Sequence, residues 1–241
     1  LLPWKNSQIG PGLAVGDING DGLEDFFIGN GEGFKGAMYL QSEKSTFKEI
    51  PGPWTDDADH EDTGALLFDA DGNGRPDLYV VSGGNDNHRS AEFYQDRLYI
   101  NTGNGFIKSK NLLPENLNQS GKCVKAADYD RDGDLDLFLG GRIVAGNYPL
   151  PASSYILENN GKKGNDLRFD NVTKEIAPEL INLGLVTDAM WDDFNSDGDI
   201  DLIVVGEWMG IRFFENSKNG FVDVSDQLGF KETVGLWYSV E

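Results

Sequence analysis

One nine-residue pattern recurs four times along this 241-residue chain, and no other feature constrains its fold as strongly. The pattern is Asp, any residue, Asp or Asn, any residue, Asp or Asn, Gly, any two residues, Asp. Its copies occupy residues 17–25, 69–77, 128–136 and 193–201, and we call them loops one to four. Their first residues lie 52, 59 and 65 positions apart, a spacing typical of repeated structural units.

Short apolar runs flank the loops and predict strands. Each loop runs directly into a β-branched or aromatic stretch, at 26–28, 78–81, 137–139 and 202–205. Similar stretches precede the loops, as at 13–15 and 65–68, and two more follow in each unit. The third stretches are 37–40, 97–100, 154–157 and 211–214, and the fourth are 46–50, 105–107, 167–169 and 220–224. Four strands in each repeat predict an all-β fold, a β-propeller of four-stranded blades.

The rest of the chain adds little regular structure to these repeats. Helical periodicity is nearly absent, and its best stretch, 174–183, is limited by Pro178. Residues 235–241 have the pattern of the strand before each loop. We therefore expect four blades and the first strand of a fifth, within a larger ring of about seven blades. We expect residues 1–241 to belong to a single propeller domain that is cut within a repeat.

Oxygen-bearing side chains at alternate loop positions suit a hard cation. Ca²⁺ gathers six to eight oxygens at about 2.3–2.6 Å, and side chains at positions 1, 3, 5 and 9 with the backbone carbonyl of position 7 would supply them. Gly at position 6 allows the positive φ of a tight turn. We therefore predict up to four Ca²⁺ ions, one in each loop. The predicted ligand residues are Asp17, Asn19, Asp21, Leu23, Asp25, Asp69, Asp71, Asn73, Arg75, Asp77, Asp128, Asp130, Asp132, Asp134, Asp136, Asp193, Asn195, Asp197, Asp199 and Asp201.

Two other interpretations of the loops compete with a calcium site in a propeller hairpin. An EF-hand would place Glu at position 12 before a helix, but all four loops have an apolar residue there, within a predicted strand. A hairpin turn favours the same Asp, Asn and Gly residues, but it does not require Asp at positions 1 and 9, and clustered carboxylates repel one another without a cation. By carboxylate count, loops three and four should bind calcium most tightly. Loop two, with Asn73 and Arg75, should bind it most weakly.

Composition excludes several other kinds of site. The formal charge of −21, from 41 acidic and 20 basic side chains, opposes a nucleic-acid partner or an anionic membrane surface. Cys123 is the only cysteine, so the chain has no internal disulfide and no Cys/His zinc site. No run of about 18 apolar residues predicts a transmembrane segment, and the first residues contain no secretion signal.

The loop and strand residues also resemble a known family. Gly16–Gly22 and the strand after it are similar to the FG-GAP repeats of the integrin alpha-subunit propeller. Ser82–Asn85, Gln95–Tyr99, Gly140–Arg142 and Val205–Met209 resemble bacterial VCBS/FG-GAP-like repeat proteins, including those with ASPIC/UnbV modules. The resemblance covers essentially the whole chain. It implies a propeller, usually of seven blades, with calcium in its hairpin loops, in an exported or surface-attached protein used for adhesion or for carbohydrate or protein binding.

Two classes of function remain open from the sequence. The first is a non-enzymatic, calcium-stabilised binding, adhesion or scaffold module, extracellular, periplasmic or on the cell surface, with a carbohydrate or protein ligand. Its contacts would come from the variable segments 51–62, 82–96 and 141–151, whose aromatic residues, such as Trp54 and Tyr148, either meet the ligand or fill gaps between blades. The second is a carbohydrate lyase or hydrolase that uses His60 or His88 as acid or base.

Overall fold

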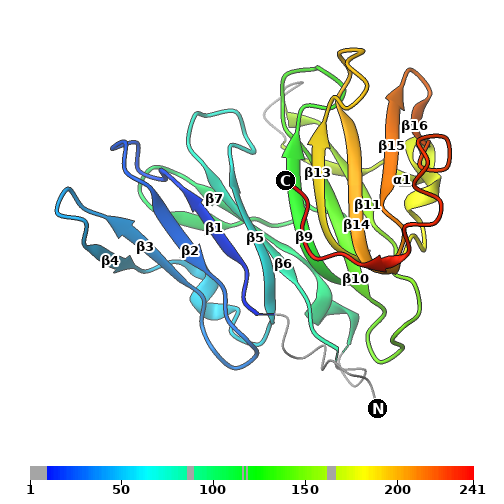
Figure 1. Ribbon diagram of the computed structural model, residues 1–241. Coiled ribbons are helices and arrows are strands. Elements are labelled where there is room, and N and C mark those ends of the chain that lie inside the picture. The colour runs from blue at the N-terminus through cyan, green and yellow to red at the C-terminus, as the bar shows by residue number, and fades with distance from the viewer. Residues whose placement is uncertain (1–9, 86–89, 116, 118, 162–166) are drawn as a thin grey trace.

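The chain folds into four antiparallel sheets in which consecutive strands pair in chain order, as expected for propeller blades (Figure 1). The computed structural model describes residues 10–85, 90–115, 117, 119–161 and 167–241. Blade one contains β1 (Leu13–Gly16), β2 (Asp25–Ile28), β3 (Ala37–Gln41) and β4 (Phe47–Ile50), and blade two contains β5 (Asp62–Phe68), β6 (Asp77–Ser82), β7 (Arg97–Asn101) and β8 (Phe106–Lys108). Blade three contains β9 (Ser120–Ala127), β10 (Asp136–Ile143), β11 (Tyr155–Asn159) and β12 (Phe169–Asn171). Blade four contains β13 (Leu185–Asp192), β14 (Asp201–Met209), β15 (Arg212–Ser217) and β16 (Gly220–Asp223). The predicted all-β, four-stranded blades are therefore confirmed.

The hydrophobic cores lie between neighbouring blades, so blades two and three are covered on both faces, whereas Leu13 and Val15 of blade one are exposed. Successive side chains of a strand point to opposite faces. In β6, Leu78 and Val80 join the core shared with blade one, whereas Tyr79 and Val81 join the core shared with blade three. A strand buried on both faces needs an unbroken apolar run, which explains why the sequence after each loop does not alternate with polar residues.

The first strands of the blades, β1, β5, β9 and β13, approach one another closely. Gly12 lies against Gly64, and a Cβ atom built on Gly12 would come within 2.4 Å of the Gly64 carbonyl carbon. A Cβ on Gly64 would lie 2.4 Å from the carbonyl oxygen of Lys122 on the next strand. Glycine is required at these two positions because any side chain would push the inner strands apart.

Short helical turns connect the strands. Two of them, η2 (Pro53–Asp56) and η3 (Ala91–Tyr94), fall in segments that the sequence predicts only as loops. The expected helical stretch before blade four is two short turns, α1 (Thr173–Ile176) and η5 (Pro178–Leu180), because Pro178 cannot continue the first. Among the described residues no helix is long and apolar enough to cross a membrane.

The C-terminal segment, which the sequence predicts as the first strand of a fifth blade, forms a strand only at its start and lies against blade four. Gly235–Leu236 forms β17, which pairs with β14. The carbonyl of Trp237 accepts a hydrogen bond of 2.6 Å from Thr187 Oγ1, as the carbonyl of Gly121 accepts one of 2.9 Å from Thr63 Oγ1 between blades two and three. The segment thus occupies the place of a following inner strand. That it begins a fifth blade stays a prediction.

Candidate metal loops

The four predicted loops connect the first and second strands of the four blades, and the glycine at position 6 has the left-handed backbone that the sequence predicts. The φ angles are 83° at Gly22, 83° at Gly74, 92° at Gly133 and 95° at Gly198. Residues other than glycine rarely adopt this backbone conformation because their Cβ atom clashes with the backbone. Each loop can therefore turn back on itself within a few residues and bring its acidic positions together.

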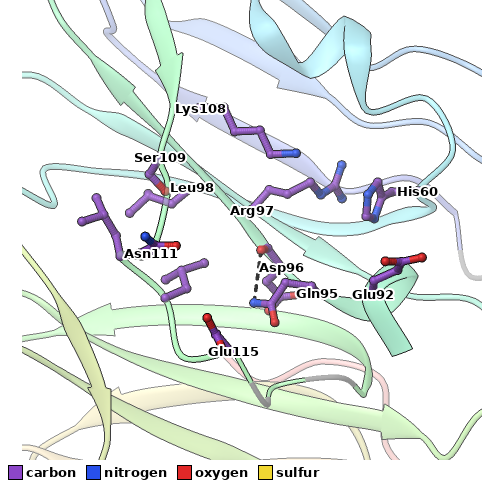
Figure 2. A pocket seen from close by; sticks show the side chains of 12 residues that line it. His60, Glu92, Gln95, Asp96, Arg97, Leu98, Lys108, Ser109, Asn111 and Glu115 are labelled. Atoms are coloured by element: carbon purple, nitrogen blue, oxygen red, sulfur yellow. Dashed lines mark hydrogen bonds between the residues drawn. The ribbon is translucent and has the colours of Figure 1, made fainter. Parts of the chain in front are cut away.

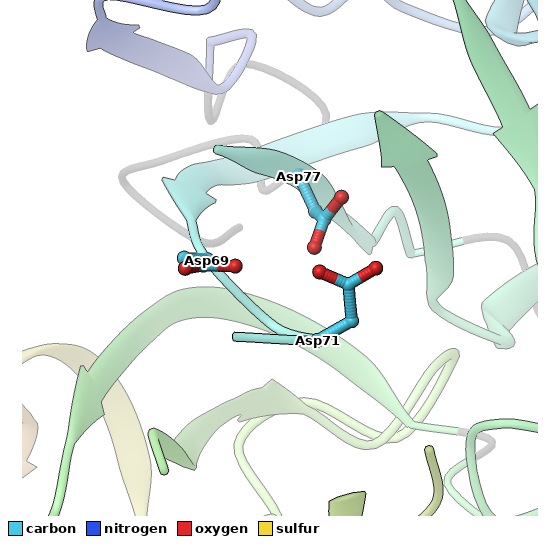
Figure 3. A group of neighbouring side chains, drawn as sticks. All are labelled: Asp69, Asp71 and Asp77. Atoms are coloured by element: carbon cyan, nitrogen blue, oxygen red, sulfur yellow. The ribbon is translucent and has the colours of Figure 1, made fainter. Parts of the chain in front are cut away.

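Loop two brings three carboxylates into one group (Figure 3). Asp69, Asp71 and Asp77 each place a carboxylate oxygen within 4.8 Å of the other two. The Asp69 carboxylate also accepts the amides of Asn73 at 2.9 Å and Gly74 at 2.7 Å. These bonds fix the carboxylate while leaving lone pairs for another partner, since each ionised carboxylate has about four acceptor sites.

Loops one and four form the same turn with an asparagine at position 3. Asp17 accepts the amide of Gly22 at 2.7 Å, and this amide is the main cause that lowers the pKa of Asp17. Asp193 accepts the amide of Gly198 at 2.9 Å. The position-3 residue of each, Asn19 or Asn195, accepts the amide two residues later at 2.9 Å. Carboxylate and amide oxygens are both suitable ligands for Ca²⁺.

Loop three gives the clearest indication that a cation fits. Asp128, Asp130 and Asp136 place carboxylate oxygens within 4.8 Å of one another. Asp128 Oδ1 is buried and has no hydrogen-bond partner among the described residues. Two ionised carboxylates at this separation repel by roughly 3 kcal/mol at an effective dielectric constant of 20. A buried, unpartnered oxygen within such a group is costly for the chain alone and is satisfied by a divalent ion.

The position-9 aspartates are buried beneath the loops. Asp25, Asp77, Asp136 and Asp201 are at most 1% exposed. In loops one and two one carboxylate oxygen accepts the amide of position 2, at 3.1 Å and 2.9 Å. The corresponding oxygens of Asp136 and Asp201 have no well-formed hydrogen bond among the described residues, although the amides of Tyr129 and Phe194 lie close by.

Burial shifts the acidity of these position-9 carboxyls. It raises the pKa of Asp77 to about 6 and that of Asp136 to about 8, and it raises the pKa of Asp201 as well. Neighbouring aspartates of the same loop shift each pKa in the same direction. The metal-free loops therefore resist full ionisation, and a bound cation would remove that penalty.

Three asparagines that the sequence analysis missed connect the loops to one another. Asn101, Asn159 and Asn216 occupy equivalent places on β7, β11 and β15, and each donates its backbone amide to the position-9 aspartate of its own blade, at 2.7, 2.8 and 2.8 Å. Each side-chain Nδ2 also donates to the position-2 carbonyl of the preceding loop, at 2.9, 2.9 and 3.0 Å. We call these residues the inter-blade asparagines. They hold loops two, three and four each against the preceding loop.

The position-7 residues were predicted to contribute only a backbone carbonyl, and their side chains differ widely. Arg75 turns toward the next hairpin, where its Nε donates to the carbonyl of Asn101 at 3.3 Å. Asp199 forms an ion pair of 2.9 Å with Arg131 of loop three. Leu23 is partly buried and Asp134 is buried. The expected order of calcium affinities among the loops stays a prediction.

The candidate ligand-binding and acid–base residues lie apart from the loops. Trp54 is only 3% exposed and packs edge-on against Phe27, Tyr99 and Phe106, so it fills the gap between blades one and two. His60 is half-buried, and its Nδ1 lies 3.2 Å from the carbonyl oxygen of Phe93.

Tyr148 meets the exposed Trp208, whose Nε1 donates to the tyrosine hydroxyl at 2.7 Å. This pair leaves part of each ring accessible, unlike Trp54. The second histidine of the sequence analysis, His88, lies outside the described residues together with its neighbour Arg89.

Comparison with known proteins gives consistent results. The family model of the FG-GAP-like repeat matches residues 17–80 and 69–139. Cartilage acidic protein 1 of Xenopus tropicalis is 26% identical over 198 residues, which cover 81% of this chain and 28% of the relative, so the chain spans less than a third of that protein. A solved Agrocybe aegerita lectin, described as recognising non-reducing terminal N-acetylglucosamine, has a similar fold, with a TM-score of 0.53 and 19% identity, over 86% of this chain and 49% of the lectin.

Proposed function

We propose that this chain, which belongs to the FG-GAP-like repeat family, is a non-enzymatic binding module whose blades are stabilised by calcium. The observation that carries the proposal is the convergence of three carboxylates in loop two and again in loop three. The unpartnered Asp128 oxygen adds to it, because hydrogen bonds within the protein do not account for this group.

The loop residues have distinct roles in this proposal. Side chains at positions 1, 3, 5 and 9 would hold the ion, and the glycine at position 6 gives the loop its curvature. The inter-blade asparagines hold each loop in place from the neighbouring blade. A bound ion would supply positive charge between carboxylates that otherwise repel. Its binding free energy would add to the stability of the folded chain by mass action.

The proposed location is outside the cytosol. Extracellular calcium modules bind with dissociation constants of about 10⁻⁴ to 10⁻³ M, which match millimolar calcium but exceed cytosolic concentrations. The charge supports this view, since thirteen of the side chains at positions 1, 3, 5 and 9 are carboxylates and four Ca²⁺ ions would change the formal charge from −21 to −13. The FG-GAP-like repeats and the similarity to cartilage acidic protein 1 point in the same direction.

We propose a carbohydrate or a protein as the ligand. The fold resembles that of a lectin described as recognising terminal N-acetylglucosamine, which favours carbohydrate. The enzymatic alternative depends on His60 among the described residues. This histidine is half-buried, and burial and the charge of Arg97 lower its pKa. Among the described residues, the hydrogen bond of its ring goes to the carbonyl of Phe93 and not to a second titratable side chain.

Thermal unfolding tests the calcium role. At 5 mM Ca²⁺, four sites with dissociation constants of about 10⁻⁴ to 10⁻³ M would together add about 4 to 9 kcal/mol. For a chain of 241 residues this corresponds to a rise in Tm of roughly 8 to 18 °C over the chelated protein. Mg²⁺ at the same concentration should give a much smaller rise. Equal Tm values with calcium and with chelator would refute the structural role.

A matched pair of variants locates the effect. Asp136→Asn removes one buried carboxylate of loop three and should reduce the calcium-dependent rise in Tm by about a quarter, because one site of four is weakened. Asp226→Asn changes an exposed aspartate outside the loops and should leave the rise unchanged. In parallel, the calcium-loaded chain is passed over immobilised glycans that include N-acetylglucosamine termini, and retention without turnover of the glycan supports a binding module.

A further inference from the structure

Blade two contains a pocket that none of the loops uses. Its volume is about 440 Å³, and polar side chains from three separate segments line it, including His60, Glu92, Arg97, Lys108 and Asn111 (Figure 2). Apolar residues Leu98, Leu112 and Leu113 line it as well. Pockets of this size that combine apolar walls with a few convergent polar groups are typical of small-ligand sites.

Arg97 is the most unusual residue of this pocket. It is only 4% exposed, and it pairs with Asp62 at 2.8 Å and with Ser82 Oγ at 3.2 Å. Its Nε atom is buried and has no hydrogen-bond partner among the described residues. A buried N–H without an acceptor is unfavourable, and a ligand hydroxyl that accepted from it would remove this penalty. Figure 2 shows the guanidinium extending toward His60.

Other polar residues around the pocket are held in place by partners behind them. Lys108 forms an ion pair with Asp57, which also accepts the Tyr99 hydroxyl at 2.7 Å. Asp96 is 7% exposed and accepts the Tyr79 hydroxyl and the Ser82 amide, both at 2.8 Å. Side chains that are fixed before a ligand arrives lose little conformational entropy on binding. The pocket therefore has the organisation of a preformed site.

At its place in the blade, a nearly fully buried arginine is found in blade two alone among the described blades. The register of the second and third strands places Ala37, Tyr155 and Arg212 at the positions equivalent to Arg97. Arg212 is the only other arginine among them; its Nε also lacks a partner among the described residues, but its side chain is 37% exposed and pairs with Asp223. Features that all four blades share, such as the loops, serve the fold. A buried arginine that lines a pocket at this register position is not shared by the other blades, so it needs another explanation.

We propose that this pocket binds an uncharged saccharide, with Arg97, Glu92 and Asn111 as hydrogen-bonding groups. This inference rests on the proposed function and names the ligand class and its place. The lining offers donors and acceptors in similar number, and its basic residues are balanced by Glu92 and Glu115. Hydroxyl groups of a sugar can match both kinds of group, and leucine side chains can cover its C–H face. The chain's charge of −21 disfavours an anionic ligand.

Asn111 allows a test that leaves the fold nearly unchanged. Its φ is 62°, in the left-handed region, where glycine is at least as favourable as asparagine. Asn111→Gly therefore removes the carboxamide without imposing backbone strain. Asn182→Gly is the matched control, because Asn182 is also exposed, has a φ of 55° and lies outside the pocket. Glu92→Gln is a second pocket variant, at an exposed residue.

The experiment measures binding of the calcium-loaded chain to an array of neutral and anionic glycans, followed by calorimetry with the best neutral oligosaccharide. We expect neutral glycans to be retained, and Asn111→Gly and Glu92→Gln each to weaken binding at least tenfold with Tm unchanged. Asn182→Gly should bind like the unmodified chain. Neutral-glycan binding that both pocket variants keep, or retention of anionic glycans alone, would overturn the pocket assignment and leave the binding module intact. Retention of no glycan would likewise overturn the saccharide assignment, whereas the calcium role stands or falls separately by thermal unfolding with and without chelator.

Discussion

Removing one inter-blade asparagine should destabilise the chain far more than removing a neighbouring asparagine. Asn101 is 4% exposed, and its side chain forms three hydrogen bonds. It donates to the carbonyl of Ile18 in loop one at 2.9 Å and to that of Pro76 at 3.1 Å, and it accepts the amide of Gly103 at 3.0 Å. At about 1 kcal/mol for each bond, Asn101→Ala should cost about 3 kcal/mol, because water cannot readily replace the lost donor.

The expected loss can be expressed as a change in Tm. Unfolding entropies of about 2.1 cal/mol/K per residue give roughly 0.5 kcal/mol/K for 241 residues, so 3 kcal/mol corresponds to a fall of about 6 °C. The control is Asn104→Ala in the same hairpin, where the side chain is exposed and a change below about 0.5 kcal/mol is expected. Differential scanning calorimetry in saturating calcium compares the two. Equal Tm values for both variants would refute a connecting role for Asn101.

Three further predictions follow from single residues. Gly74→Val and Gly229→Val both place a β-branched residue at a φ above 80°, so each variant should lose on the order of 2 kcal/mol of stability. Only Gly74→Val should also reduce the stabilisation by calcium, which unfolding with and without chelator measures. Burial raises the pKa of Asp96 to about 7, so the contribution of this residue to stability falls as the pH rises from about 4 to about 7. Urea unfolding at pH 5 and pH 8 should therefore show a smaller difference in the free energy of unfolding for Asp96→Asn than for the unmodified chain. An equal difference for both would contradict this prediction. Burial raises the pKa of the Cys123 thiol to about 12, so iodoacetamide at pH 8 should alkylate the native chain at least a hundredfold more slowly than the urea-unfolded chain; comparable rates would show that the thiol is accessible.

The sequence predicts the strands and the loop turns well because both depend on local patterns. The runs after each loop, such as Leu78–Val81, are apolar at every position, and in blades two and three the structure buries both of their faces. The glycine at position 6 follows from the backbone geometry of the turn alone. These features need no knowledge of which segments meet in space.

The inter-blade asparagines and the blade-two pocket depend on contacts between distant parts of the chain. Asn101 bonds to a carbonyl 83 residues away, and Arg97 pairs with an aspartate 35 residues away. A local pattern does not reveal such partners. One signal was available for the asparagines, since the third strand of three repeats carries an Asn before the turn into the fourth. Comparison of the repeats in register would have found it.

The role of Trp54 shows the same limit. The sequence leaves two possibilities for an aromatic residue in a variable segment, ligand contact or filler between blades. The positions of Phe27 and Tyr99 on the two flanking blades show that Trp54 fills the gap between blades.

A crystal structure from millimolar calcium, with anomalous scattering data, tests the central claim most directly. The account predicts an anomalous peak in each of the four loops. Each peak should lie about 2.3–2.6 Å from oxygens at positions 1, 3, 5 and 9 and from the carbonyl of position 7. Loops that contain only water, with Asp128 Oδ1 hydrogen-bonded to it, would contradict a calcium-stabilised module.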